Sequence, residues 1–449
     1  MMRSLQRTSR RLRSVMVLIV AAVTPVTIAM GASTPQPGEA AFRDLYRELV
    51  ETNTTLSVGS CTAAAEKMAA RLQRAGMPAA SLQILAPAEF PQSGSLIASY
   101  PGKDAQLEPI MLLAHIDVVE ARREDWVRDP FTLVEEDGFF YARGASDDKA
   151  MASIFTDLLV RWSEQQYRPQ RGVTLALTCG EETSEHFNGV LWLLQNHPAL
   201  MRAKFVLNEG AGGLLDASGK HLSLDVQAGE KVYQDFRLEV THPGGHSSRP
   251  TRENPISRMA AALTRLAAYQ FPVSLNDTTR AYFLAQAEMA SPDVAADMRA
   301  VVTDPTNDEA AQRLWTANPS WNGMLRTTCV ATQFDGGHAP NALPQRAKVN
   351  VNCRILPGVP MEQVRADLIR VIADDAISVN FGDERGLPAP APPLTAEMLD
   401  PIRAIAKTLW PEARVVPTMA TGATDGRFLN AAGTPTYGIS GVFADAAGS

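Results

Sequence analysis

Acidic side chains and one histidine gather at the ends of apolar segments in this 449-residue sequence. Burying a carboxylate without a cationic partner is costly, and two adjacent carboxylates repel each other. A pair of divalent metal ions would neutralise them, and mixed imidazole and carboxylate ligation suits zinc, for which cobalt or manganese can substitute. The residues that we select for this chemistry are His115, Asp117, Asp147, Asp148, Glu181, Glu182 and Glu209. They predict a site that holds two divalent metal ions and a bound water.

The spacing within two of these motifs indicates separate roles for neighbouring residues. His115 and Asp117 lie two residues apart in "MLLAHIDVV", so on a strand they share one face. One of them can ligate a metal while the other holds the imidazole in the correct tautomer. Glu181 and Glu182 are adjacent in "CGEET" and turn in different directions, so one can bind metal while the other reaches a bound water. Each motif alone has an ordinary explanation, such as a helix start or a solvated turn, but their joint placement favours one site.

The hydrophobic pattern predicts the elements that must position these residues. Near-continuous apolar strands alternate with helices, which predicts an α/β fold with a largely parallel sheet and helices on both faces. After Gly229 the strands alternate apolar and polar residues around two amphipathic helices, which predicts an inserted α+β lid or dimerisation domain. Open α/β sheets bind ligands at the carboxyl ends of their strands, where the acidic residues fall. We expect a catalytic domain over residues 38–230 and 390–449 and the inserted domain over residues 231–389.

The net charge, the cysteines and the N-terminal residues indicate which partners the protein binds and where in the cell it is located. The formal net charge of −7 argues against a nucleic-acid partner. Residues 1–32 have the arginine-rich start, apolar run and small residues of a signal peptide, so we expect an exported protein, periplasmic or secreted, with an uncleaved membrane anchor as the alternative. Export permits disulfides among the four cysteines. Buried free thiols are the simplest expectation, and a bridge between Cys329 and Cys353 is the alternative.

Seven motifs, in order from about Ala41 to the end of the sequence, resemble the di-zinc aminoacylase and carboxypeptidase family. They read "AHIDVV", "YARGASDDKA", "CGEET", "LNEG", "GGHSSRP", "NALPQRAKVNVNCRILPG" and "ATGATDGRF". This family includes acetylornithine deacetylase, succinyl-diaminopimelate desuccinylase, glutamate carboxypeptidase and carnosinase. A polar, helix-rich insertion over roughly residues 272–320 is similar to the carboxypeptidase S-like branch. The resemblance implies hydrolysis of an amide bond in a small peptide or N-acyl amino acid that bears a free carboxylate.

The resemblance also implies which residues hold the two zinc ions. His115 and Glu209 would ligate the first zinc, and Glu182 would ligate the second. Asp147, rather than Asp148, would bridge both ions, and the family implies a cis peptide bond just after it.

Three further residues would take part in the reaction. Glu181 would act as the general base, taking a proton from the bridging water and passing it to the leaving amine. Asp117 would orient the ligating imidazole. His246 of "GGHSS" would stabilise the tetrahedral oxyanion, for which an ordinary turn histidine is the alternative. In dimeric relatives this histidine reaches the partner's active site, which is compatible with a homodimer formed through the inserted domain.

Four other residues resemble substrate-binding positions. Asn341 and Arg354 resemble residues that hold the free carboxylate, a task that suits the planar fork of arginine. A surface ion pair is the alternative for Arg354. Gly422 and Thr424 resemble the family's glycine-rich substrate loop, and a simple tight turn is the alternative there.

The sequence departs from the family pattern at the last metal ligand. The family places a histidine on the second zinc after the segment that matches "PTYGISGVFADAAGS", and no histidine follows it here. The second zinc site is therefore incomplete, with Asp147 and Glu182 as its protein ligands and His186 as a candidate substitute. We expect the sequence to be a fragment of a longer hydrolase. The competing hypothesis is a catalytically silent binding protein on the same scaffold.

Overall fold

The computed structural model describes residues 36–183 and 186–445. The predicted signal peptide, residues 1–32, lies outside the described residues. Among the helices that are described, none is both long and apolar enough to cross a membrane.

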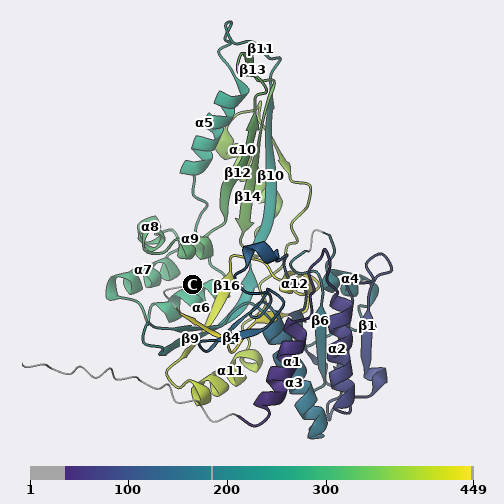
Figure 1. Cartoon of the computed structure of the whole chain (residues 1–449). Coiled ribbons are helices and arrows are strands. Elements are labelled where there is room, and N and C mark those ends of the chain that lie inside the picture. The colour runs from purple at the N-terminus through teal and green to yellow at the C-terminus, as the bar shows by residue number, and fades with distance from the viewer. Residues whose placement is uncertain (1–35, 184–185, 446–449) are drawn as a thin grey trace, which may run out of the picture. The chain divides into compact units, whose positions relative to one another are not determined.

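Ten strands form the main sheet in the described part of the chain, in the order β1-β2-β6-β3-β7-β17-β9-β8-β18 with β16 beside β9 (Figure 1). Their bounds are β1 (Leu82–Leu85), β2 (Ser95–Tyr100), β3 (Ile110–His115), β6 (Val173–Thr178), β7 (Val206–Asn208), β8 (Gly213–Leu215), β9 (His221–Glu230), β16 (Arg414–Ala420), β17 (Thr436–Gly438) and β18 (Phe443–Asp445). The central strands β6, β3, β7 and β17 run parallel, whereas β1 and β2 add antiparallel pairs at one edge. The predicted α/β fold is thus confirmed, with a sheet that is parallel mainly at its centre.

Helices cover both faces of this sheet because its central strands are apolar on both sides. Leu112 of β3 packs into a core with α1, α2 and α3, and its neighbours Met111 and Leu113 pack into a second core with α4 and α12. Val226 of β9 packs with α11. The helices are α1 (Glu39–Val50), α2 (Cys61–Arg74), α3 (Lys149–Glu164), α4 (Gly189–Asn196), α11 (Ala396–Leu409) and α12 (Gly426–Ala431).

A second, antiparallel sheet has the strand order β12-β14-β10-β15, and we call it the lid sheet. Its strands are β10 (Val232–Thr241), β12 (Thr328–Gly336), β14 (Arg346–Ile355) and β15 (Ser378–Phe381), and helices α5 (Pro255–Ala268) and α10 (Met361–Ile372) pack on it. Along β10 the buried residues Phe236, Leu238 and Val240 alternate with more exposed ones, as the sequence predicts. Two short two-stranded sheets complete the described strands: β4 (Val134–Glu136) with β5 (Phe139–Tyr141), and β11 (Gly245–His246) with β13 (Ala342–Leu343). The domain boundaries proposed from the sequence remain a proposal.

Four helices fill the predicted insertion between α5 and β12. They are α6 (Asp277–Gln286), α7 (Pro292–Thr303), α8 (Asp308–Ala317) and α9 (Pro319–Leu325). Their core includes Phe283, Met298 and Leu325, and Met419 of β16 joins it. The Thr278 hydroxyl also donates to the Ala228 carbonyl of β9 at 2.9 Å. The insertion therefore packs against β9 and β16 of the main sheet.

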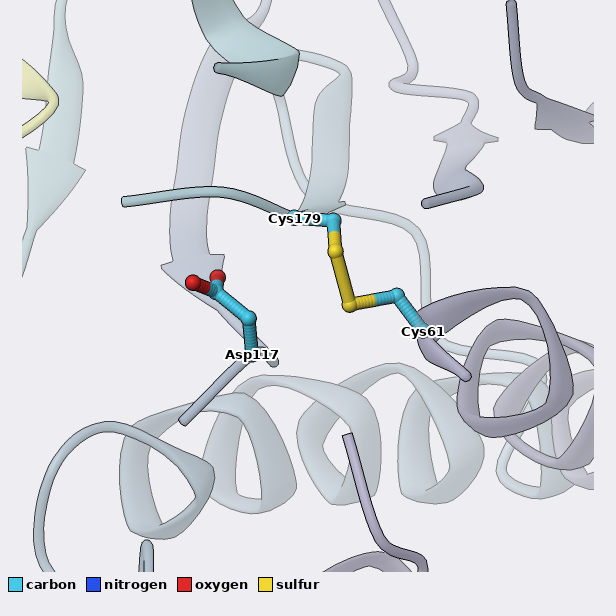
Figure 2. A group of neighbouring side chains, drawn as sticks. All are labelled: Cys61, Asp117 and Cys179. Carbon is cyan, nitrogen blue, oxygen red and sulfur yellow. A yellow bond between two sulfur atoms is a disulfide. The ribbon is translucent and has the colours of Figure 1, made fainter. Parts of the chain in front are cut away.

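All four cysteines are paired, so the prediction of free thiols is wrong. Cys329 and Cys353 face each other on β12 and β14, which confirms the alternative for that pair. Cys61 and Cys179 form a second disulfide that spans 118 residues and ends beside Asp117 (Figure 2). Sequence spacing did not indicate this pair, because its members meet only after α2 packs on the sheet. Their sulfurs lie close to the Asp117 carboxylate, but each is bonded to the other and is not a metal donor in this state.

Candidate active site

His115 is the centre of the predicted ligand cluster. It ends β3, where its side chain is 2 % exposed. Its Nε2 atom lies 2.9 Å from Asp147 Oδ1 and 3.7 Å from Glu209 Oε2. Its Nδ1 atom faces the other way, 3.1 Å from the Asp117 carbonyl and 3.6 Å from Asp117 Oδ1. Three predicted metal ligands therefore converge at Nε2, while Asp117 holds the opposite nitrogen, as a metal-binding imidazole requires.

Burial and the neighbouring carboxylates shift the pKa of His115 in opposite directions. Burial lowers the pKa of His115, but hydrogen bonds with Asp117, Asp147 and Glu209 outweigh it and raise the pKa well above its ordinary value. The hydrogen bond to His115 in turn lowers the pKa of Asp147. A cluster that stabilises a cationic imidazole in this way has the charge to hold a divalent metal instead.

Asp147 and Asp148 precede α3 and are joined by a cis peptide bond, as the family resemblance implied. The Asp147 side chain is exposed and contacts His115, whereas Asp148 is buried and its Oδ2 atom has no hydrogen-bond partner. A donor atom of Asp148 also lies within 4.8 Å of donors from His115 and Glu209. Burial raises the pKa of Asp148 well above its ordinary value. An unpartnered, buried carboxylate oxygen beside a histidine and a glutamate fits a metal ion.

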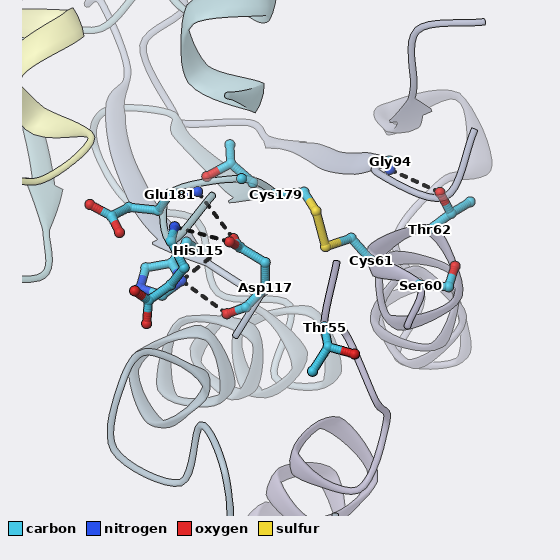
Figure 3. Close-up of a disulfide and its surroundings, with 12 residues drawn as sticks. Thr55, Ser60, Cys61, Thr62, Gly94, His115, Asp117, Cys179 and Glu181 are labelled. Atoms are coloured by element: carbon cyan, nitrogen blue, oxygen red, sulfur yellow. Dashed lines mark hydrogen bonds and ion pairs between the residues drawn. A yellow bond between two sulfur atoms is a disulfide. The ribbon is translucent and has the colours of Figure 1, made fainter. Parts of the chain in front are cut away.

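Glu181 and Glu182 form a turn directly after β6, whose residues are all buried. The turn is attached to Asp117: the Glu181 and Glu182 backbone N–H groups donate to its two carboxylate oxygens at 3.3 and 3.1 Å (Figure 3). Burial, followed by the charge of Asp425, raises the pKa of Glu181 to about 9, and burial also raises the pKa of Glu182. Glu181 therefore needs a nearby cation to be ionised at neutral pH.

Two residues around this turn, Asn188 and Asp425, were not predicted from the sequence to belong to the site. Asn188 Nδ2 donates to the Gly180 carbonyl at 3.2 Å and to Asp425 Oδ1 at 2.6 Å. Its Oδ1 accepts from the Leu191 N–H and caps α4. Asp425 is 2 % exposed, and burial raises its pKa to about 6. The "TDG" stretch of the last family motif contains Asp425, but nothing in its spacing separates a buried carboxylate from a turn residue.

The predicted substrate loop lies beside the ligands. Asn208, next to Glu209, donates through Nδ2 to Thr424 Oγ1 at 3.2 Å, and the Thr424 N–H donates to Glu230 Oε2 at 2.7 Å. Gly422 lines a cavity of about 660 Å³ together with Asp147, Asp148 and Glu209. The loop and the ligand cluster thus border one cavity.

Arg354 approaches the same loop from the lid sheet. It stands on β14 opposite Tyr233 of β10, and its guanidinium lies 4.7 Å from the centre of that ring. Its Nη1 atom donates to the Thr421 carbonyl at 3.4 Å. The structure therefore brings Arg354 to the loop that carries Gly422 and Thr424.

His246 and Asn341 lie together, but away from this region. His246 is on β11 and Asn341 comes just before its partner strand β13, and the Ser247 N–H donates to the Asn341 carbonyl at 3.0 Å. The His246 ring is exposed and contacts Ser248. Strand β10 leads there from Lys231, whose N–H donates to the Ala420 carbonyl of the main sheet. Ten residues of strand at roughly 3.4 Å each span roughly 34 Å, so within one chain these two residues do not join the metal ligands.

The candidate substitute ligand His186 gains no support. Its ring is exposed, and the contact that the structure gives it is a backbone bond to the Thr183 carbonyl at 2.9 Å. In the described part of the chain, His115 is thus the imidazole at the ligand cluster.

A family model, described as peptidase family M20/M25/M40, matches residues 111–448 of the chain. Among curated relatives, the human "N-fatty-acyl-amino acid synthase/hydrolase PM20D1" is 29% identical over 358 residues, which cover 78% of this chain and 70% of the relative. The Dictyostelium discoideum "Probable carboxypeptidase S-like 2" is 28% identical over 340 residues, which cover 74% of this chain and 64% of the relative. The chain thus spans about two thirds of the length of these relatives.

Solved structures show the same fold. An M20 family metallo-carboxypeptidase from Sulfolobus solfataricus superposes with a TM-score of 0.62 at 18% identity and covers 89% of this chain and 90% of its own. A Bacillus subtilis protein described as a dinuclear metal binding peptidase from the M20 family superposes with a TM-score of 0.55 at 13% identity and covers 90% of this chain and 88% of its own.

Proposed function

The chain belongs to peptidase family M20/M25/M40, and we propose that it uses two divalent metal ions to hydrolyse an amide bond next to a free carboxylate. The convergence of Asp147 and Glu209 on His115 Nε2, with Asp117 on the opposite nitrogen, carries this proposal. Zinc suits the imidazole and carboxylate donors. His115, Asp147, Glu182 and Glu209 would hold the ions, and the unpartnered Asp148 oxygen supports a cation at this position.

Each group of the chain has a task in this reaction. When bound, the ions would polarise the amide carbonyl and make water a stronger acid. Glu181 takes the proton of the attacking water and then delivers it to the leaving nitrogen. Asp117 keeps the proton of the imidazole on Nδ1 and holds the backbone of Glu181 in place.

The substrate that we propose is a small peptide or an N-acyl amino acid. Arg354 and the loop at Gly422 and Thr424 would bind its free carboxylate, because a guanidinium pairs with both carboxylate oxygens. The printed names of the two relatives, an N-fatty-acyl-amino acid synthase/hydrolase and a "Probable carboxypeptidase S-like 2", favour these two substrate classes. We also propose that the protein is exported through residues 1–32, and its two disulfides favour an oxidising compartment.

His246 and Asn341 would act in a second copy of the chain. Both lie at the far end of the lid sheet, and the reaction needs a donor for the negative charge on the tetrahedral oxygen. We therefore propose a homodimer in which His246 of each copy completes the site of the other.

The function is tested with Glu181→Gln in zinc-loaded protein. Loss of the general base should lower kcat by about 100-fold or more with N-acyl amino acids and dipeptides as substrates, while zinc content stays unchanged. Glu309→Gln is the matched control, because this glutamate is 91% exposed on α8. Unchanged turnover in the Glu181 variant contradicts the mechanism. A wild-type protein that binds zinc and substrate without turnover supports the binding-protein hypothesis instead.

A further inference from the structure

The Cys61–Cys179 disulfide ends two residues before the proposed general base. Cys179 follows β6 and Cys61 opens α2, and both are buried, with 6% and 2% of their surfaces exposed. Their Cα atoms are 6.0 Å apart. Figure 2 shows the bridge running from the end of β6 to α2, with the Asp117 side chain beside it. The bridge therefore ties a helix of the outer layer to the backbone that leads into Glu181.

Hydrogen bonds hold the other residues of this turn. Asp117 accepts from the Glu181 and Glu182 N–H groups, and Asn188 donates to the Gly180 carbonyl. The Gly189 N–H donates to the Cys179 carbonyl at 2.7 Å. Every residue from Cys179 to Glu182 thus has a fixed partner, and the disulfide is the one covalent restraint among them.

The other end of the bridge is a rigid anchor. The Ser60 side chain caps α2 by accepting from the Ala63 N–H at 3.0 Å. Thr62 accepts from the Gly94 N–H at 2.9 Å, just ahead of β2 (Figure 3). Met68 and Leu72, on the buried face of α2, have no exposed surface. A bond to α2 therefore restrains Cys179 relative to the core.

We propose that the Cys61–Cys179 disulfide is a positioning element of the active site, which fixes the backbone that presents Glu181 and Glu182. This proposal rests on the proposed function. Glu181 and Glu182 act only if they stand at the correct distance from the ions and the substrate, and small displacements of such groups cost rate steeply. Substrate binding involves Arg354 and the loop at Gly422, which the bridge does not touch. Its loss therefore acts on kcat and on metal geometry more than on KM.

The test compares two double variants of the zinc enzyme. Cys61→Ala with Cys179→Ala removes this bridge, and Cys329→Ala with Cys353→Ala removes the bridge in the lid sheet as the matched control. For the first we expect kcat to fall about 10-fold or more, faster zinc loss to a chelator and an altered visible spectrum of the cobalt-substituted protein, with KM changed less than about threefold. For the control we expect a lower melting temperature with kcat and the cobalt spectrum unchanged.

Three outcomes overturn the proposal. The first is a Cys61/Cys179 variant that loses only stability while its kcat and cobalt spectrum stay as in the wild type. The second is an equal loss of kcat in both double variants. The third is a rise in KM with kcat unchanged. If the alanine pair does not fold, the serine pair at the same positions, which resembles the reduced cysteines in shape, is measured instead.

Failure of the proposed function gives a different result. A wild-type protein that binds cobalt but does not hydrolyse any substrate contradicts the function. The cobalt spectrum of the two double variants then still decides whether the bridge positions the ligands.

Discussion

The carboxylate of Asp117 connects the two halves of the ligand cluster. One oxygen lies 3.6 Å from His115 Nδ1 and also accepts from the Glu181 N–H, and the other accepts from the Glu182 N–H. Burial raises its pKa, but hydrogen bonds and the charge of His115 outweigh this effect and keep the pKa below its ordinary value. A single ionised side chain therefore sets both the imidazole and the turn that carries the proposed base.

Replacing Asp117 with Asn should disturb both the His115 imidazole and the turn at Glu181 and Glu182. The amide nitrogen is a donor, so it would face either a backbone N–H or the histidine N–H, and one contact would be lost. We expect kcat/KM to fall by about 10- to 100-fold and zinc affinity to fall with it. Steady-state kinetics and zinc content after dialysis measure this. Asp375→Asn, at an exposed site after α10, is the control, and an equal loss in both variants would contradict the assigned role.

Glu230 makes folding stability depend on pH. It is 4% exposed, and burial raises its pKa from 4.5 to about 7, although the Thr424 N–H opposes the shift. A carboxyl group whose pKa is raised on folding stabilises the fold fully below its unfolded pKa, and this stabilisation is lost as pH rises through the folded value.

The variant Glu230→Gln tests this dependence. Between pH 4.5 and about 7 the unfolding free energy of the wild type should fall relative to that of the variant, by up to roughly 3 kcal/mol, and then level off. Urea denaturation across this range, on zinc-free protein, measures the difference. Parallel curves for the two proteins would show that Glu230 does not titrate there.

Individual residues of the site differed in how well the sequence predicted them. His115, Asp117 and Glu209 stand at the ends of apolar strands, so pattern and residue type together indicated them. Asn188 and Asp425 act through contacts across 237 residues, which no local pattern encodes. The pairing of Cys61 with Cys179 depends in the same way on how α2 packs.

At the scale of elements, the register of β3 and β6 assembles the site. The two strands are parallel with His115 opposite Thr178, and the Ile116 N–H donates to the Thr178 carbonyl at 2.8 Å. Parallel neighbours end at the same edge of a sheet, so the histidine and the two glutamates arrive there together. The side-chain cluster is thus a consequence of strand direction.

Gly180 lets the chain turn sharply after β6. Its φ of +95° suits glycine, and an added Cβ would lie 2.2 Å from the Phe187 carbonyl oxygen. Gly76 is a matched control with a φ of +105° and nothing within 4 Å of its Cβ position. Gly76→Ala should cost about 1–2 kcal/mol of unfolding free energy from backbone strain alone.

Gly180→Ala should cost more than its control, by about 2 kcal/mol or more, because the backbone of the turn must also move. It should weaken zinc binding as well, which the control variant should not. Thermal denaturation and chelator-driven zinc loss measure the two effects. Equal stability losses with unchanged zinc binding would mean that the turn tolerates the side chain.

The sequence predicted best those helices and strands whose apolar residues follow a regular pattern. The period-two pattern of β10 and β14 indicated the lid sheet, and apolar runs indicated the parallel centre of the main sheet. The antiparallel pairs in the main sheet, such as β1 with β2 and β8 with β9, were not predicted. An apolar strand can pair with either a parallel or an antiparallel neighbour, so the connections between strands and the packing of the sheet determine its partner.

At the scale of the whole molecule, two inactive variants can test whether two copies share their sites. In the proposed dimer, His246→Ala and Glu181→Ala damage different parts of one site. Co-expressed copies that pair at random should recover about a quarter of wild-type activity, because half of the dimers keep one intact site. Activity of the mixed dimers, isolated through two affinity tags, measures this. Mixed dimers without activity would contradict the shared site.

Lys231 joins β9 of the main sheet to β10, the long strand of the lid sheet. Its ammonium group donates to the carbonyls of Gly323 and Arg326, each at 2.8 Å, just where β10 leaves the main sheet. Beyond Lys231, β10 and β14 pair along ten residues of each strand, and His246 follows the end of β10. Because Gly323 and Arg326 supply these two carbonyls, the end of the helical insertion fixes the residue from which β10 runs toward His246.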